Sequence, residues 1–223
     1  MCKLRIAIDG PAGAGKSTVA RYVAQNLHIH HLDTGSMYRA LGLFALENGV
    51  DPMDAAGVAA LLEGADIAVT YDEAGAQHVW LNGVDRTLDL RTEAVSRAAS
   101  AVSLLPAARE KLAALQRAVG ERYSIVMDGR DITTNVLPDT PYKFFVTASV
   151  GERTRRRMRQ LKRLGQDADF NQVRADILAR DEQDSNRDYM PLRRTEDTML
   201  IDTTNISVRE AVEKIIECVM RNA

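Results

Sequence analysis

Eight residues decide the fold of this chain: Gly10-Pro11-Ala12-Gly13-Ala14-Gly15-Lys16-Ser17. They fit the pattern Gly-x-x-x-x-Gly-Lys-(Ser/Thr) at every required position. The apolar run Leu4–Ile8 before them is typical of a strand, and Ser17–Leu27 after them has the pattern of a helix. In that context the backbone N–H groups of the loop and the positive end of the helix point at phosphate oxygens. The sequence therefore predicts a phosphate-binding loop (P-loop).

Two side chains of this loop have expected chemical roles. We expect Lys16 to reach the β and γ phosphates of a nucleoside triphosphate, and Ser17 to offer its hydroxyl to Mg²⁺. The alternative is a glycine-rich turn that matches by chance, which the flanking strand and helix disfavour. The residues expected to contact the triphosphate are Gly10, Pro11, Ala12, Gly13, Ala14, Gly15, Lys16, Ser17 and Thr18.

Short apolar runs alternate with longer amphipathic segments along the chain, which is typical of an α/β fold with a parallel sheet. Five runs are candidate strands, so we expect a five-stranded parallel sheet flanked by helices: 4–8, 29–32, 125–127, 144–146 and 200–201. A helix is expected over 37–47. The final helix should have one apolar face and be capped by Asn205 or Ser207; that face consists of Val208, Ala211, Val212, Ile215 and Val219.

Residues 66–90 interrupt this alternation. The runs 67–71 and 79–81 predict a pair of antiparallel strands, and Asn82-Gly83 adds a turn signal. Residues 92–119 have a helical pattern that Pro106 divides in two. We interpret the whole chain, 1–223, as one domain with an insertion at about 60–105, packed on the ligand-binding edge of the sheet.

Composition limits the classes of function. The net charge of −2, from 29 basic and 31 acidic residues among 223, gives no reason to expect a nucleic-acid partner. Cys2 and Cys218 lie at opposite ends of the chain and form no zinc-binding pattern. No run of 18 apolar residues indicates a membrane span, and no signal-peptide pattern precedes Leu4. We expect a soluble, cytoplasmic monomer.

Arginines recur along the chain at positions where loops are expected. Bidentate arginines clamp phosphates and neutralise developing charge, as transfer between two anionic substrates requires. No guanine-reading Asn-Lys-x-Asp element is present, which disfavours a GTPase. Ser124–Asp128 is a fair match to the apolar run ending in Asp that many P-loop proteins carry. The recurring arginines are Arg39, Arg109, Arg130, Arg153, Arg155, Arg156, Arg157, Arg180 and Arg187.

Four motifs carry a resemblance to a known family, the bacterial cytidylate (CMP) kinases, and they run in order over nearly the whole chain. They are Ile8–Thr18; Leu32-Asp33-Thr34-Gly35-Ser36-Met37-Tyr38-Arg39; Met127-Asp128-Gly129-Arg130-Asp131; and Ala179-Arg180-Asp181 with Asp184, Asn186 and Arg187. The resemblance implies a P-loop kinase fold with a nucleoside-monophosphate (NMP) binding region at 33–119 and an Arg-rich lid at 153–170. It also implies Mg²⁺-dependent transfer of the γ-phosphoryl group of ATP directly to CMP or dCMP, giving CDP or dCDP.

The resemblance also implies site residues. Thr34, Tyr38 and Arg39 would lie along the monophosphate site. Ser100, Arg109 and Asp131 would read the cytosine ring, because a carboxylate accepts from its exocyclic amine and penalises the carbonyl of uracil. The catalytic set would be Lys16, Arg130, Arg187, Arg180 and Asp184. Within that set, Arg130 and Arg187 would hold the acceptor phosphate together with Arg39. Arg180 and Asp184 would meet the ribose hydroxyls or the transferring phosphate. In the lid, Arg156 and Arg157 would contact ATP.

Alternatives remain for individual residues and for the function. Tyr38 could be a core residue, Arg109 a solvated helix charge, and Asp131 a structural partner of a neighbouring arginine. The acceptor could instead be UMP, AMP or a compound such as shikimate. A non-catalytic ATP-binding regulator is the rival from another class.

Thr133 departs from the family pattern, which usually has glycine at this position. Because a β-branched residue strongly disfavours φ > 0, we expect strain if the loop needs that conformation. Asn135 and Leu137, where an apolar residue and an aromatic residue are common, are further departures. These departures place acceptor specificity or rate in doubt more than the fold.

Overall fold

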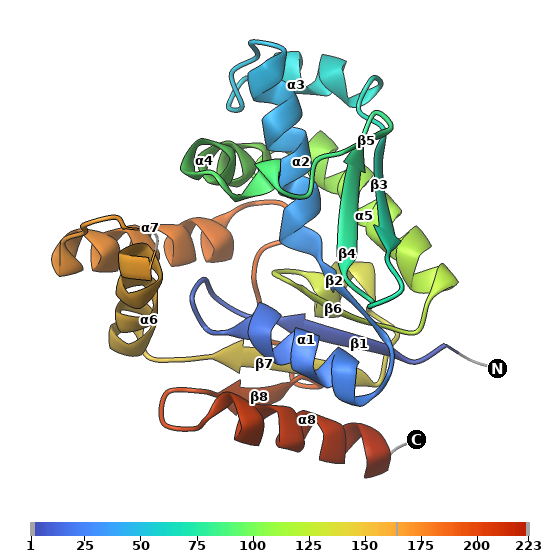
Figure 1. Ribbon diagram of the computed structural model, residues 1–223, viewed down its shortest axis with the longest axis vertical. Helices are drawn as coiled ribbons and strands as arrows, with labels where there is room; N and C mark the ends of the chain where they lie inside the picture. The colour runs from blue at the N-terminus through green and yellow to red at the C-terminus, as the bar shows by residue number, and fades with distance from the viewer. Residues whose placement is uncertain (1–2, 164, 222–223) are drawn as a thin grey trace. The chain divides into compact units, whose positions relative to one another are not determined.

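The structure is a computed structural model that describes residues 3–163 and 165–221. Cys2, residue 164 of the predicted lid, and the ends of the predicted domain (1–2 and 222–223) lie outside the described residues. In chain order the elements are β1 (Arg5–Asp9), α1 (Lys16–Asn26), β2 (His30–Asp33), α2 (Thr34–Glu47), α3 (Ala55–Leu62), β3 (Ile67–Tyr71), β4 (Gln77–Leu81), β5 (Val84–Asp85), η1 (Asp89–Arg91), α4 (Glu93–Val102), α5 (Pro106–Arg122), β6 (Ile125–Gly129), η2 (Ile132–Val136), β7 (Tyr142–Thr147), α6 (Val150–Arg163), α7 (Phe170–Asn186), β8 (Met199–Asp202) and α8 (Val208–Arg221) (Figure 1).

The chain divides into two compact units. Unit 1 contains Met1–Leu4 and His30–Ile125, and unit 2 contains Arg5–Ile29 and Val126–Ala223. The P-loop, α6 and α7 therefore belong to unit 2, whereas α2, α4, α5 and the small antiparallel sheet belong to unit 1.

Unit 2 is built on parallel strands whose central residues are apolar. β7 pairs in parallel with β1 on one side and with β8 on the other, with Phe144 opposite Ile8 and Met199. Ile6, Ala7 and Ile8 are fully buried, as expected for a strand of a sheet covered on both faces. α1 packs against α8. The P-loop follows the carboxyl end of β1, which is where parallel α/β sheets bind ligands.

The larger sheet has the strand order β2-β6-β1-β7-β8, so all five predicted strands are present within a residue or two of their expected bounds. The predicted five-stranded α/β fold is confirmed. At the start of the last helix, Ser207 and Glu210 form a capping box: the Glu210 N–H donates to Ser207 Oγ, and the Ser207 N–H donates to Glu210 Oε2. Four residues of the predicted apolar face are buried, Ala211, Val212, Ile215 and Val219, whereas Val208, the first residue of α8, is 41% exposed.

Unit 1 contains the predicted antiparallel pair. β3 pairs with β4 along its whole length, and the turn at Asn82-Gly83 returns the chain as β5. Pro106 stands at the first position of α5 and separates it from α4, as predicted, because proline is tolerated where a helix begins. α2 begins at Thr34 rather than Met37, so the motif around Tyr38 lies in the first turns of a helix.

No helix among residues 3–163 and 165–221 has the length and apolar character needed to cross a membrane.

Candidate active site

The P-loop has the conformation that its glycines allow. Gly10 has φ 147°, and a Cβ added there would lie 1.9 Å from the carbonyl oxygen of Val146, so only glycine fits. Gly15 is the N-cap of α1 in the left-handed conformation, with φ 91°. No side chain caps this helix and no acidic residue lies in its first turn. The amides of the first turn are therefore left for an anionic ligand.

Lys16 lies inside the loop and is 5% exposed. Its Nζ donates to the carbonyl oxygen of Pro11 at 2.8 Å. Burial and, after it, the positive charge of Arg130 lower the pKa of Lys16 to about 7, although the negative charges of Asp128, Asp184 and Asp9 act in the opposite direction. Phosphate oxygens next to this amine would favour its charged form. Lys16 is thus a buried amine whose charged form a bound polyanion would stabilise.

The hydroxyl of Ser17 donates to Asp128 Oδ2 at 2.6 Å, next to the phosphate loop. A hydroxyl and a carboxylate are hard oxygen ligands of the kind Mg²⁺ prefers, so these two residues fit the ion that a P-loop kinase uses. The sequence had marked Asp128 as the end of an apolar run but had assigned it no role. In the described chain, no group of three His, Cys, Asp or Glu side chains could hold a metal ion by itself.

A second charged cluster in unit 2 joins the two predicted motifs around Arg130 and Arg187. Arg130 Nε donates to Asp184 Oδ2 at 2.7 Å, and Arg187 Nη1 lies 3.4 Å from Asp184 Oδ1. Arg187 Nη2 lies 3.9 Å from Asp131 Oδ1. The side chains of Asp184, Asp131 and Arg187 are each less than a tenth exposed. The structure therefore brings four of the predicted acceptor residues together.

The charges of this cluster stabilise its ionised form. Burial raises the pKa of Asp184, but the charge and hydrogen bond of Arg130 and the charges of Arg180 and Arg187 lower it by more. The pKa of Asp184 therefore lies below its usual value. Asp184 in turn helps to raise the pKa of Arg130 against the effect of burial. Arg180 is exposed on α7. One carboxylate thus fixes the guanidinium groups of two arginines.

The loop at Thr133 does not adopt the positive φ that would have caused strain. Outside the glycines, positive φ among the described residues occurs only at His28, Asn82 and Met190. Thr133 lies in a short π-helical turn, η2. Its N–H and hydroxyl both donate to Asp9 Oδ2, at 2.8 and 2.7 Å. The side chain that replaces the usual glycine thus binds a buried carboxylate that sequence reasoning had not singled out.

The remaining predicted acceptor residues lie in unit 1. Arg39 Nη2 pairs with Asp33 Oδ2 at 2.5 Å, and Thr34 is buried at the start of α2. Arg109 is 2% exposed, so its interpretation as a solvated helix charge was wrong. Its guanidinium carbon lies 5.7 Å from the centre of the Tyr38 ring, and Nη1 donates to the Ser103 carbonyl. Tyr38 and Ser100 are half-buried.

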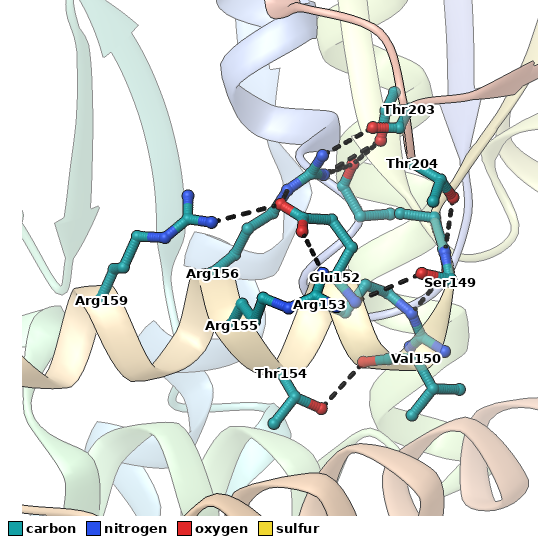
Figure 2. A network of polar contacts seen from close by, with 12 residues as sticks. Ser149, Val150, Glu152, Arg153, Thr154, Arg155, Arg156, Arg159, Thr203 and Thr204 are labelled. Atoms are coloured by element: carbon teal, nitrogen blue, oxygen red, sulfur yellow. Dashed lines mark hydrogen bonds and ion pairs between the residues drawn. The ribbon is translucent and has the colours of Figure 1, made fainter.

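The arginines of α6 differ in their contacts (Figure 2). Arg156 donates to the Ala14 carbonyl of the P-loop and to Thr203, and Figure 2 shows its guanidinium directed at Thr203. Arg157 is exposed and donates to Gln160 of its own helix. Arg153 was not among the predicted site residues, yet it is 4% exposed and donates to the Ala12 carbonyl. The arginines of α6 therefore differ in burial and in hydrogen-bond partners, which their sequence alone does not predict.

The sheet order, the P-loop between β1 and α1, and the buried Lys16 define the class of protein: a P-loop kinase. A family model described as cytidylate kinase matches residues 6–221. The chain belongs to the cytidylate kinase family, as its motifs indicated.

Curated relatives agree with this assignment. The chain is 46% identical to a cytidylate kinase of Halalkalibacterium halodurans, with 97% of each chain covered. It is 45% identical to one of Carboxydothermus hydrogenoformans, with 98% of each covered. Among solved structures, an uncharacterized protein from Eubacterium ventriosum matches with a TM-score of 0.56 and 16% identity, covering 99% of each chain. That last likeness concerns the fold alone.

Proposed function

We propose that this protein phosphorylates CMP and dCMP with ATP, giving CDP or dCDP and ADP. The observation that carries the proposal is the cluster in which one buried carboxylate, Asp184, holds Arg130 and Arg187 while Asp131 lies beside them. Two fixed guanidinium groups suit a dianionic phosphate acceptor. A buried carboxylate next to them suits the amine of cytosine. The family to which the chain belongs supports the same activity.

On the donor side, residues 10–18 are proposed to bind the phosphates of ATP. Ser17 and Asp128 would hold Mg²⁺, which supplies neutralisation of charge between the β and γ phosphates when bound. Arg157, which is exposed on α6, would contact ATP directly. Arg156 would contribute at least through the P-loop carbonyl that it binds.

On the acceptor side, Arg39, Arg130 and Arg187 are proposed to bind the phosphate of CMP, with Thr34 and Tyr38 along the same substrate. Ser100, Arg109 and Asp131 would read the base, and Arg180 and Asp184 would act at the ribose or the transferring phosphate. In this proposal 33–119 is the NMP-binding region, including the insertion at about 60–105, and 153–170 is the lid. We further propose that the single domain 1–223 acts as a monomer in the cytoplasm, where ATP is made and used.

The chain's own residues would act by alignment and electrostatics. The acceptor phosphate attacks the γ-phosphorus directly, so no side chain acts as a nucleophile. Lys16 and the arginines would stabilise charge that spreads over the transferring group. A transfer of this kind needs water kept from the γ-phosphate, which we assign to closure of the NMP-binding region and the lid.

An ADP-release assay with CMP, dCMP, UMP, AMP and shikimate as separate acceptors tests the proposal. We expect ADP production that depends on CMP or dCMP, with kcat/KM at least about tenfold lower for UMP because an unpaired carbonyl would face Asp131. Preferred use of UMP, AMP or shikimate would reject the assigned acceptor. ATP binding without any acceptor-dependent ADP would instead support a regulator that has lost transfer.

A further inference from the structure

Arg153 is a buried cation that joins three segments of unit 2. Its Nε donates to the carbonyl oxygen of Ala148 at 3.0 Å, and Nη1 donates to that of Ala12 at 3.1 Å. Nη2 pairs with Asp181 Oδ2 at 2.6 Å. The three segments are the end of β7, the P-loop and α7, the helix that carries Asp184. Every nitrogen of this guanidinium is bound to protein.

Arg156, three residues further along α6, also donates to a carbonyl of the P-loop, and Figure 2 shows its guanidinium next to Thr203. Its Nη1 donates to the carbonyl oxygen of Ala14 at 3.1 Å and lies 3.0 Å from Thr203 Oγ1. Nη2 donates to the Thr203 carbonyl at 2.7 Å, and Nε lies 3.2 Å from Glu152. The Thr203 hydroxyl also lies 3.0 Å from the Ala14 oxygen. One helix thus binds two carbonyls of the P-loop, at alternate residues.

Binding a carbonyl fixes the direction of the next amide. The peptide group is planar and trans, so the C=O of one residue and the N–H of the next point in opposite directions. Holding the Ala12 and Ala14 oxygens toward α6 therefore turns the Gly13 and Gly15 N–H groups away from α6. Glycine otherwise imposes little restriction on these planes, because it populates many conformations. A charged donor on the carbonyl also polarises the peptide and strengthens its N–H as a donor.

We propose that Arg153 and Arg156 are positioning residues for ATP, acting through the backbone of the P-loop. They orient the Gly13 and Gly15 amides that receive the phosphates. Arg153, through Asp181, also ties this loop to α7, which carries the arginine-binding Asp184. The inference rests on the proposed use of ATP by this loop, but it does not depend on the identity of the acceptor.

The test measures binding of β,γ-imido-ATP with Mg²⁺ by calorimetry, in the absence of any acceptor. Arg153→Lys keeps the charge and can reach one partner, but a single ammonium cannot hold Ala12, Ala148 and Asp181 in the fixed geometry of a guanidinium. We expect binding about tenfold weaker, as loss of one charged hydrogen bond predicts. The matched control is Arg155→Lys, because Arg155 lies on the same helix, is 61% exposed and pairs with Glu152; its affinity should stay within about twofold.

Two further measurements separate positioning from mere stabilisation. In steady-state assays, Arg153→Lys should raise KM for ATP and lower kcat while KM for the acceptor changes little. Unchanged affinity for β,γ-imido-ATP, together with a lower unfolding midpoint, would overturn the proposal and leave a structural ion pair. Failure of the wild-type protein to phosphorylate CMP would reject the proposed function but not this inference, since the binding test contains no acceptor.

If Arg153→Lys does not fold, Asp181→Asn decides the question. This change keeps all three contacts geometrically possible and removes only the negative charge that holds the guanidinium. We expect β,γ-imido-ATP to bind about threefold more weakly, because the amide oxygen still accepts a hydrogen bond from Arg153 but lacks the negative charge that strengthens it. Wild-type affinity in a folded Asp181→Asn protein would contradict the proposal.

Discussion

Replacing Thr133 by valine removes one hydroxyl and keeps the shape of the side chain. In the wild-type protein, Asp9 is fully buried and accepts three hydrogen bonds from η2: from the Ile132 N–H at 3.0 Å, the Thr133 N–H at 2.8 Å and the Thr133 hydroxyl at 2.7 Å. A hydrogen bond to a charged group contributes about 1.5–3 kcal/mol, and one between neutral groups about 1 kcal/mol. The effect of Thr133→Val therefore depends on whether Asp9 is ionised.

Burial, helped by the charge of Asp131, raises the pKa of Asp9 from 3.8 to about 6, even though the hydrogen bonds from η2 act to lower it. The raised pKa means that the protonated form favours folding. This contribution is fully present below pH 3.8 and is lost as pH rises through 6. The shift of about two units corresponds to about 3 kcal/mol. Because the Thr133 hydroxyl favours the charged form, removing it enlarges that loss at high pH. We expect Thr133→Val to destabilise the fold by about 1 kcal/mol at pH 5 and about 2 kcal/mol at pH 8.

Urea denaturation at both pH values measures these differences. Far-UV circular dichroism is the appropriate signal, because the one tryptophan, Trp80, lies in unit 1 and would not report on unit 2. Thr133→Ser is the control: it keeps the hydroxyl, loses a methyl group, and should cost about 1 kcal/mol at either pH. Equal losses for Thr133→Val at pH 5 and pH 8 would refute the reasoning. Thr133→Gly, the usual family residue, should destabilise at least as much as valine, since glycine also adds backbone entropy to the unfolded chain.

Three further outcomes are expected. Lys16→Ala should lower kcat by at least about a hundredfold with an unchanged circular dichroism spectrum, and near-normal turnover would reject the P-loop mechanism. At pH 8, ATP binding should be accompanied by the uptake of about 0.9 proton from the buffer, because Lys16 with a pKa of about 7 is mostly neutral there and the phosphates favour its charged form. Calorimetry in two buffers of different ionisation enthalpy measures this uptake, and its absence would contradict the prediction. Asp131→Ala should reduce the preference for CMP over UMP by about tenfold or more in competition assays, and an unchanged ratio would remove Asp131 from base reading.

The features that the sequence predicted well depend on local patterns. The P-loop needs glycines at set positions between a strand and a helix, and all of that information lies within about twenty residues around Gly10–Ser17. The strands were recognisable because buried parallel strands are nearly continuous apolar runs, as in β1 and β6. The division of α4 from α5 followed from Pro106 alone.

The features that were missed depend on contacts between distant segments. Asp9 and Thr133 are 124 residues apart in the chain, and no local pattern in either segment predicts their contact. The rule about φ at Thr133 concerns one residue alone, whereas the structure pairs this residue with a buried carboxylate that needs hydrogen-bond donors. The same holds for Asp128, whose bond to Ser17 spans 111 residues.

The arginines of α6 show why residue type does not determine role. Arg153, Arg155, Arg156 and Arg157 lie within one and a half helical turns, so composition alone suggests a single cationic surface. The helical period instead directs Arg153 and Arg156 toward the P-loop and leaves Arg155 and Arg157 exposed. A buried guanidinium must have its donors satisfied, and the Ala12 carbonyl accepts from one nitrogen of Arg153, as the Ala14 carbonyl does from the partly buried Arg156. The P-loop pattern specifies glycines that let amides face phosphate, but it leaves their peptide planes unconstrained. The carbonyl groups of that loop are therefore the place where α6 can influence ATP binding without contacting ATP.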